Sequence, residues 1–166
     1  MSFQNMPSPS PEAKDVFVAN YPGDSAAFLA TGYFVNAKFE LAELTLEVAP
    51  EFIVDACRAL QADGYNFFED CTCVDWYPTE PRFQVTYSLL SHQYKQRIRV
   101  IARLSSQEPV IASITSVWPA ANFYEREVFD LFGVRFTGHP RLTRIMMPDN
   151  WNGHPLRKDY PVEGYR

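Results

Sequence analysis

Residues 96–104 read QRIRVIARL, and this stretch decides the fold class. Apolar and mostly basic side chains alternate along it, with Ile98, Val100, Ala102 and Leu104 in one series and Arg97, Arg99, Ile101 and Arg103 in the other. Because successive side chains of a strand point to opposite faces, the pattern predicts a strand with one buried and one positively charged face. Two strand-like stretches precede it, residues 65–76 and 82–90, so we predict an antiparallel meander.

The flanking segments add helices and shorter strands. Pro50 opens a pattern with helical spacing that ends at Gly64, and the pattern turns helical again from Ile111. The other expected elements are helices at residues 25–32 and 119–131 and strands at residues 40–48 and 134–136. The predicted fold class is therefore α+β, with a mixed, mainly antiparallel sheet layered with helices and an extended C-terminal tail.

Three regions differ in composition. Residues 1–23 are rich in Ser, Pro and Asn and predict a flexible, loosely attached lead. Residues 24–136 hold the α+β domain. Residues 137–166 contain many Pro and Gly, which exclude long regular elements, yet they carry too much apolar surface for a solvated end. We expect this tail to lie against something, most simply a partner protein.

Composition narrows the class of protein. With 166 residues, 46% hydrophobic, the chain is long enough for one compact domain. Three cysteines without a CxxC pair provide neither a disulfide framework nor a four-ligand zinc site, so we expect a reduced, intracellular protein. No apolar run approaches the ~20 residues of a membrane span, and the first twenty residues show no targeting pattern.

Charge is unevenly distributed along the chain. Residues 1–80 carry 13 acidic and 3 basic side chains, a net charge of −10, whereas residues 81–166 carry 7 and 12, a net charge of +5. Two interpretations stay open: a polarised surface that docks in one orientation, or acids and bases that intermix in space. Nucleic acid is a weaker candidate partner because the overall pI is acidic and no binding motif accompanies the basic residues.

Common catalytic and metal motifs are absent. The sequence contains no GxGxxG, Walker A, GxSxG or HExxH pattern. Cys71 and Cys73 would share one face of a strand, where packing is the stronger interpretation than metal binding. His139 and His154 each precede a proline and, with the isolated His92, indicate turn residues rather than ligands.

The helix from Pro119 is the most informative segment. A helical projection places on one broad face Phe123, Tyr124, Glu127, Val128, Leu131 and Phe132. Glu127 would then be a buried acid, either in a structural ion pair, which we favour, or at a proton-handling site. Arg126 and Asp130, four apart on the other face, can pair, and Phe129 among them suggests that a second surface covers the helix.

The same region resembles a known family. Residues 118–142 (WPAANFYEREVFDLFGVRFTGHPRL) and 144–161 (RIMMPDNWNGHPLRKDYP) closely resemble the C subunit, the 30 kDa-type subunit, of the proton-pumping NADH:quinone oxidoreductase, respiratory complex I. The family signature E-R-E-x-x-D, with a following aromatic residue and Gly, is met at residues 125–133, and its G-H-P and G-H-P-L-R-K-D-[YF] continuations at 138–140 and 153–160. Weaker similarity reaches back to about Leu41.

The resemblance implies a hydrophilic-arm subunit without catalytic, cofactor or metal residues of its own. FMN, iron–sulfur clusters and quinone would belong to partner subunits. The expected partners are the quinone-site D subunit, over which the tail would extend, and the cluster-bearing B and I subunits. The hetero-oligomer would lie on the cytoplasmic side of the bacterial plasma membrane, held there through partners only.

The signature and the helix pattern together mark the expected partner-interface residues: Glu125, Arg126, Glu127, Phe129, Asp130, Gly133, Gly138, His139, Pro140, Trp151, Gly153, His154, Pro155, Leu156, Arg157, Lys158, Asp159 and Tyr160. Two other hypotheses remain open. One is the equivalent subunit of a ferredoxin-linked photosynthetic-type complex or a membrane-bound hydrogenase. The other is a free-standing enzyme that uses Glu127.

Overall fold

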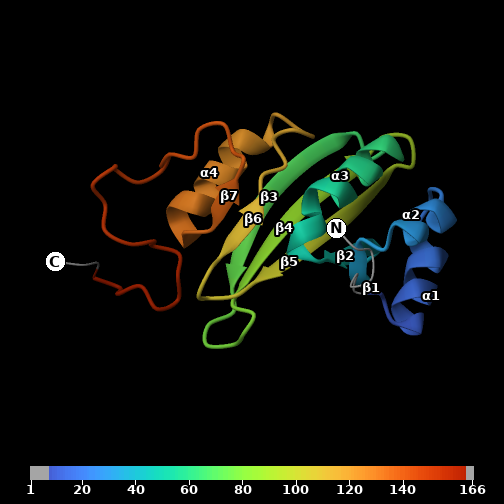
Figure 1. Ribbon diagram of the computed structural model, residues 1–166, viewed down its shortest axis with the longest axis horizontal. Coiled ribbons are helices and arrows are strands. Elements are labelled where there is room, and N and C mark those ends of the chain that lie inside the picture. Colours follow the sequence, from blue (N-terminus) through green and yellow to red (C-terminus); the bar gives the residue numbers. More distant parts are fainter. Residues whose placement is uncertain (1–7, 164–166) are drawn as a thin grey trace.

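A five-stranded sheet forms the centre of the fold in the computed structural model, which describes residues 8–163 (Figure 1). Its strands lie in the order β1-β2-β5-β4-β3. Their bounds are β1 Phe34–Glu40, β2 Glu43–Val48, β3 Phe67–Asp75, β4 Phe83–Ser91 and β5 Gln96–Leu104. The predicted antiparallel meander β3-β4-β5 is confirmed, and β2 joins it in parallel beside β5. The fold is α+β, as the sequence predicts.

The predicted strand at residues 40–48 is in fact the second arm of a hairpin. β1 precedes it and pairs with β2 in antiparallel register, and the two strands meet at Leu41 and Ala42, both with positive φ. β1 is hard to recognise because only Phe34 and Ala37 within it are buried. Its alternation is therefore weak, as expected for an edge strand.

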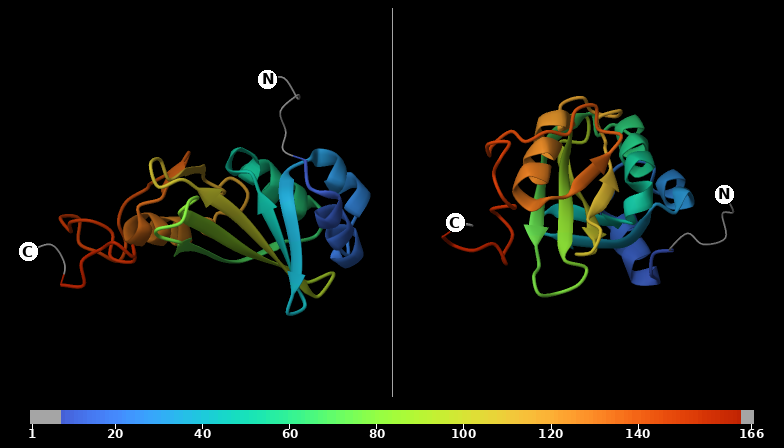
Figure 2. Two further views of the ribbon diagram at one scale, coloured as in Figure 1. Left: turned by 90° about the horizontal axis from the view of Figure 1, so that it is seen from below. Right: turned by 60° about the vertical axis from the view of Figure 1, so that its left-hand side comes forward.

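Two helices and a small parallel sheet cover one face of the large sheet (Figure 2). Helix α3 (Ile53–Ala62) follows a 3₁₀ turn that begins at Pro50, and helix α4 (Ala121–Phe132) ends at Gly133. Between them lie β6 (Val110–Ala112) and β7 (Arg135–Thr137). The expected helical pattern from Ile111 is wrong, because Ile111 pairs with Phe136 in this sheet. The predicted short strand near 134–136 is β7.

The other face of the sheet carries ion pairs. Arg97 pairs with Glu69 at 2.8 Å, Arg103 pairs with Glu47 at 3.3 Å, and Arg99 pairs with Glu43. The prediction of a positively charged face is therefore wrong. Each of these arginines of the basic half meets a glutamate of the acidic half, so that acids and bases intermix here.

The N-terminal segment is more structured than its composition predicts. Residues 11–20 form helix α1 (Pro11–Asn20), and helix α2 (Ser25–Thr31) follows as expected. The Ser10 side chain accepts a hydrogen bond from the Ala13 N–H at 3.2 Å, and Pro11 occupies the first turn. Phe17 is fully buried against Phe34, with ring centroids 5.0 Å apart. The described part of the expected loose lead is thus packed on β1, whereas residues 1–7 lie outside the described residues.

All three cysteine side chains are buried in the core, and the strand that carries Cys71 and Cys73 packs against α4. Cys71 and Cys73 share the inner face of β3, and Cys57 faces them from α3. Burial raises the pKa of Cys73 to about 12, so this thiol stays protonated at neutral pH. Within residues 8–163, no helix is long and apolar enough to cross a membrane.

Candidate functional site

Helix α4 presents a different face to the sheet from the one expected. Its buried positions include Ala121, Glu125, Val128 and Phe132, which repeat at three- and four-residue intervals. Asp130 is also buried, on the side of the helix that the tail covers. Glu127 is exposed, so the prediction that it lies buried in the apolar stripe is wrong. The true stripe is rotated toward Ala121, because Phe123 points outward with 62% of its surface exposed. The hypothesis of an enzyme built on a buried Glu127 loses its basis.

Glu125 is the buried acid on the sheet side of α4. Its carboxylate accepts hydrogen bonds from the Ser113 hydroxyl at 2.6 Å and from the Ile114 N–H at 2.8 Å. Burial raises the pKa of Glu125 to about 7, even though both hydrogen bonds favour the charged form. Glu125 therefore ties α4 to the loop that follows β6.

His139, at the start of the tail, packs on the same carboxylate. Its Nε2 lies 4.0 Å from a Glu125 oxygen, and both side chains are fully buried. The same nitrogen lies 3.1 Å from the Asn122 carbonyl, and Nδ1 accepts the Arg141 N–H at 3.0 Å. His139 is thus both a turn residue, as predicted, and a side chain that closes the beginning of α4.

Asp130, the second buried acid of α4, fixes the tail on the opposite side. One carboxylate oxygen accepts the consecutive N–H groups of Ile145, Met146 and Met147 at 2.7–2.9 Å. The other oxygen pairs with Arg144 at 2.6 Å. Burial opposes ionisation, but these four donors outweigh it and lower the pKa of Asp130.

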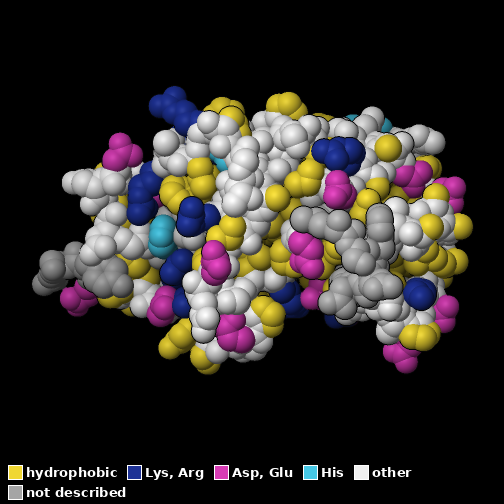
Figure 3. Space-filling view, viewed as in Figure 1, with side chains coloured by type: hydrophobic (Ala, Val, Ile, Leu, Met, Phe, Trp, Pro, Cys, Tyr) yellow, Lys and Arg dark blue, Asp and Glu magenta, His cyan; other side chains and the backbone are white. Residues whose placement is uncertain are grey.

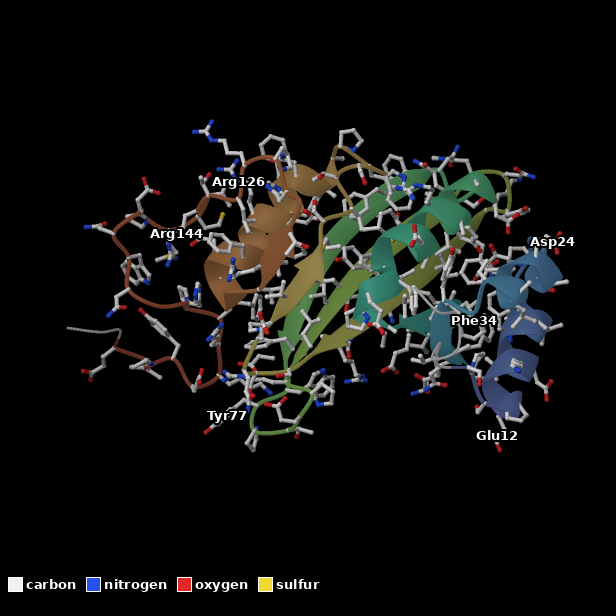
Figure 4. The ribbon with its side chains drawn as sticks, viewed as in Figure 1. Glu12, Asp24, Phe34, Tyr77, Arg126 and Arg144 are labelled. Carbon is white, nitrogen blue, oxygen red and sulfur yellow. The ribbon has the colours of Figure 1, made fainter. Side chains whose placement is uncertain are left out.

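Arg126 also binds the tail rather than Asp130, so the predicted pairing within the helix is wrong. Its guanidinium donates to the Thr143 carbonyl at 3.0 Å, the Thr143 hydroxyl at 3.1 Å and the Arg144 carbonyl at 3.1 Å. Arg126 and Arg144 both lie between α4 and the tail (Figure 4). The second surface expected to cover the helix is therefore supplied by the chain itself.

The tail also caps the C-terminal end of α4. The His154 ring lies 2.9 Å from the Asp130 carbonyl, the Leu156 N–H donates to the Leu131 carbonyl at 3.0 Å, and Arg157 donates to the Phe132 carbonyl at 2.5 Å. These are carbonyls that a helix end leaves without partners inside the helix. Phe129 packs edge-on against the His154 ring, with centroids 6.5 Å apart.

A second set of contacts joins the tail to the two sides of the turn between β3 and β4. Arg82 donates two hydrogen bonds of 2.8 Å to Asp75 and pairs with Asp159 of the tail at 2.6 Å. The Lys158 N–H reaches the same Asp75 carboxylate at 2.8 Å. Burial alone would raise the pKa of Asp75, but the Arg82 and backbone donors lower it to about 2.

Asp75 and Arg82 hold the tail but are not among the residues that the sequence predicts for the site. A signal was available for Asp75, because it continues the inward series of Cys71 and Cys73 along β3. A carboxylate on that face requires a cation. The partner Asp159 is 77 positions away from Arg82, and nothing local in the sequence joins them.

The other expected interface residues lie along the surface of the tail. Gly138 and Pro140 are exposed, and Gly153 is partly buried, with its carbonyl accepting from Arg144 at 3.1 Å. Trp151, Pro155 and Tyr160 line a hollow of about 410 Å³ on the outer side. The large apolar side chains that remain exposed on α4 and the tail are Phe123, Ile145, Met146, Trp151, Leu156 and Val162. Lys and Arg side chains gather over the same end of the molecule (Figure 3).

Polar contacts within the chain and exposed apolar side chains lie together at this end of the molecule. Within residues 8–163, no three His, Cys, Asp or Glu side chains lie together as metal ligands. Arg126, Asp130 and His154 of the signature hold the tail to α4 through hydrogen bonds and an ion pair. Several large apolar side chains of the tail remain exposed. Such outward apolar surface, supported from below, is typical of a protein interface.

Comparisons with known proteins agree on one family. Residues 46–166 match the model of the "Respiratory-chain NADH dehydrogenase, 30 Kd subunit". The chain is 49% identical over 123 residues to the C subunit of NADH-quinone oxidoreductase from Roseiflexus castenholzii, covering 72% of this chain and 71% of the relative. It is 45% identical over 136 residues to the C subunit of the same enzyme from Citrifermentans bemidjiense, covering 79% and 84%.

Two solved structures share the fold. A trypsin-resistant fragment (1-134) of Nqo5 is 31% identical, with a TM-score of 0.63, covering 70% of this chain and 95% of that one. A chain of the membrane-bound sulfane sulfur reductase, an archaeal respiratory membrane complex, is 25% identical, with a TM-score of 0.72, covering 82% and 83%.

Proposed function

Because the chain belongs to the 30 kDa subunit family of respiratory-chain NADH dehydrogenase, which includes the C subunit of NADH-quinone oxidoreductase, we propose that it is a cofactor-free subunit of the hydrophilic arm of complex I. Its role is to support the assembly and geometry of the quinone-reducing module. Electrons then pass from NADH to quinone through FMN and iron–sulfur clusters that neighbouring subunits hold.

One observation carries this proposal: the signature residues hold the tail in one fixed course across α4. Asp130, Arg126 and Arg144 fix its first half, and Arg82 holds it at Asp159. A segment that is already ordered loses less conformational entropy when it binds. The exposed Trp151 and Leu156 are therefore presented to a partner in a defined position.

The partners that we propose are the quinone-site D subunit on the tail, with the cluster-bearing B and I subunits nearby. The complex lies on the cytoplasmic side of the bacterial plasma membrane, and this chain reaches the membrane through its partners only. The exposed apolar side chains of the tail support this arrangement, because a partner subunit would cover them.

The test is purification of the complex from cells through a tag on a partner subunit. Leu156→Glu places a charge on the tail surface, and Val18→Glu places the same charge on α1; the two side chains are 52% and 50% exposed. We expect Leu156→Glu to lower the amount of this chain that co-purifies with NADH:quinone oxidoreductase activity, and Val18→Glu to leave it unchanged. Equal recovery of both variants would contradict a tail interface.

A second candidate rests on the likeness to a chain of the archaeal membrane-bound sulfane sulfur reductase. The fold also fits the equivalent subunit of a ferredoxin-linked photosynthetic-type complex or a membrane-bound hydrogenase. The electron donor of the purified complex separates these possibilities. Oxidation of NADH supports the first proposal, whereas ferredoxin or hydrogen as the donor supports the second.

A further inference from the structure

The turn between β3 and β4 exposes aromatic side chains that the family signature does not include. Trp76 and Tyr77 are 44% and 49% exposed, and Val74 beside them on β3 is 37% exposed. They lie at the end of the meander nearest the tail, where Figure 4 labels Tyr77. Exposed Trp and Tyr side chains are enriched at the energetic centres of protein interfaces.

Backbone hydrogen bonds hold this turn in place. The Trp76 N–H donates to the Arg82 carbonyl at 2.8 Å, and the Thr79 N–H donates to the Trp76 carbonyl at 2.9 Å. The Tyr77 N–H donates to the Asp75 carboxylate at 2.9 Å. The aromatic side chains are therefore presented on a braced turn, which lowers the entropy lost when a partner covers it.

Glu80 braces the same turn from outside. Its carboxylate accepts the Arg82 N–H at 3.1 Å and the Ser106 N–H at 3.2 Å, which joins the turn to the segment after β5. The turn is thus tied to the residue that precedes β4 and to the segment that follows β5.

The Trp76 ring offers apolar surface, because its one polar atom already has a partner. The indole N–H of Trp76 donates to the Gln84 side chain at 3.2 Å. The Arg82 guanidinium lies 4.9 Å from the centre of the Tyr77 ring, a cation–π contact on the inner side. A partner that fits this turn must therefore provide an apolar pocket, because the indole has no donor left to satisfy.

Arg82 makes the turn and the tail one unit. The same guanidinium contacts Tyr77, pairs with Asp75 beneath the turn and pairs with Asp159 of the tail. One buried side chain therefore holds the turn beside the part of the tail that carries Asp159 (Figure 1).

We propose that Val74, Trp76 and Tyr77 form a second anchor for the partner protein that binds the tail, and that they insert into an apolar pocket of that partner. This inference rests on the proposed function, because it assigns the occupant of the turn to the same neighbouring subunit.

The experiment compares three variants of the full chain in the tagged complex. Val74→Glu adds a charge to the patch without removing any hydrogen bond of the turn, and the double variant Trp76→Ala with Tyr77→Ala removes the rings. Phe67→Ala is the matched control, since Phe67 is a 49% exposed aromatic residue at the other end of the same strand. Both patch variants should lower the co-purified chain at least ten-fold, with Phe67→Ala at the wild-type level and all thermal midpoints close to wild type.

The outcomes separate this inference from the proposed function. If both patch variants match Phe67→Ala while Leu156→Glu is lost from the complex, the turn is no anchor and the tail interface stands. If the patch variants are lost while Leu156→Glu is retained, the turn anchors the partner and the tail role is wrong. Retention of every variant in the complex overturns both proposals. They are also overturned if the wild-type chain self-associates and Val74→Glu abolishes this self-association while the complex still assembles.

Discussion

Gly133 and His154 lie so close together that no side chain would fit between them. A β-carbon built on Gly133 would lie 2.6 Å from the His154 ring and 2.5 Å from the Arg157 guanidinium. The helix stop that the sequence predicts at Gly133 is therefore also the surface on which the tail rests.

We expect Gly133→Ala to detach the end of the tail. Gly138→Ala is the control, because Gly138 has nearly the same φ, +78° against +76°, but has nothing within 4 Å of its added β-carbon. Both variants bear the cost of left-handed backbone, about 1–2 kcal/mol. Only Gly133→Ala should also speed trypsin cleavage after Arg157 or Lys158, which gel analysis follows. Equal cleavage rates would show that the contact is unimportant.

Asp130→Asn should release the first half of the tail. The change removes the charge opposite Arg144 and weakens the acceptor of three N–H groups, at a cost of roughly 3 kcal/mol for a buried pair. Urea unfolding and trypsin cleavage after Arg144 provide the two measurements. Glu127→Gln on the exposed side of α4 is the control and should leave both unchanged. A similar loss in the control would restore a structural role for Glu127.

Glu125→Gln should alter the dependence of stability on pH. The pKa of Glu125 is about 7 in the folded chain, against the ordinary value of 4.5. The contribution of this group to the free energy of unfolding is therefore fully present below pH 4.5 and is lost as the pH rises through about 7. The wild-type free energy of unfolding should fall relative to the variant by about 3 kcal/mol across that window. Urea titrations at pH 4.5 and pH 8 measure it. Parallel behaviour of the two proteins would mean that Glu125 is solvated.

Asp75 should give the opposite dependence at low pH. Its pKa is lowered from 3.8 to about 2, so its stabilisation is present above pH 3.8 and is lost as the pH falls through about 2. Between pH 4 and pH 2 the wild type should lose about 2 kcal/mol more than Asp75→Asn. Acid unfolding followed by circular dichroism tests this, with exposed Asp149→Asn as the control. Equal acid sensitivity of wild type and Asp75→Asn would contradict the ion pair between Asp75 and Arg82.

The parts of the fold that could be predicted depend on local pattern. The alternation at residues 96–104 identifies β5, and Gly133 identifies the end of α4. Each of these signals lies within or next to a single element and needs no contact with a distant segment. Ser10 and Pro11 are strong start signals for helix α1, but the Ser- and Pro-rich composition around them favours a flexible segment instead.

The sequence directs attention to α4 and the tail, but it does not give the contacts between them. The choice between Glu125 and Glu127 depends on which edge of the apolar stripe meets the sheet, and a helical projection leaves that rotation open. The pairing of Arg82 with Asp159 depends on tertiary folding of distant segments. Contacts between such distant segments have no signal in spacing or composition.

The place of β5 in the sheet determines when the sheet can be completed during synthesis of the chain. β5 lies between β2 and β4, and Leu44 of β2 is paired with Ile98. On the ribosome the β1-β2 hairpin emerges before β5. Glu43 and Glu47 are therefore solvated until Arg99 and Arg103 of β5 can pair with them. The hairpin joins the sheet only when residues 96–104 are released, and the nascent chain stays acidic until then.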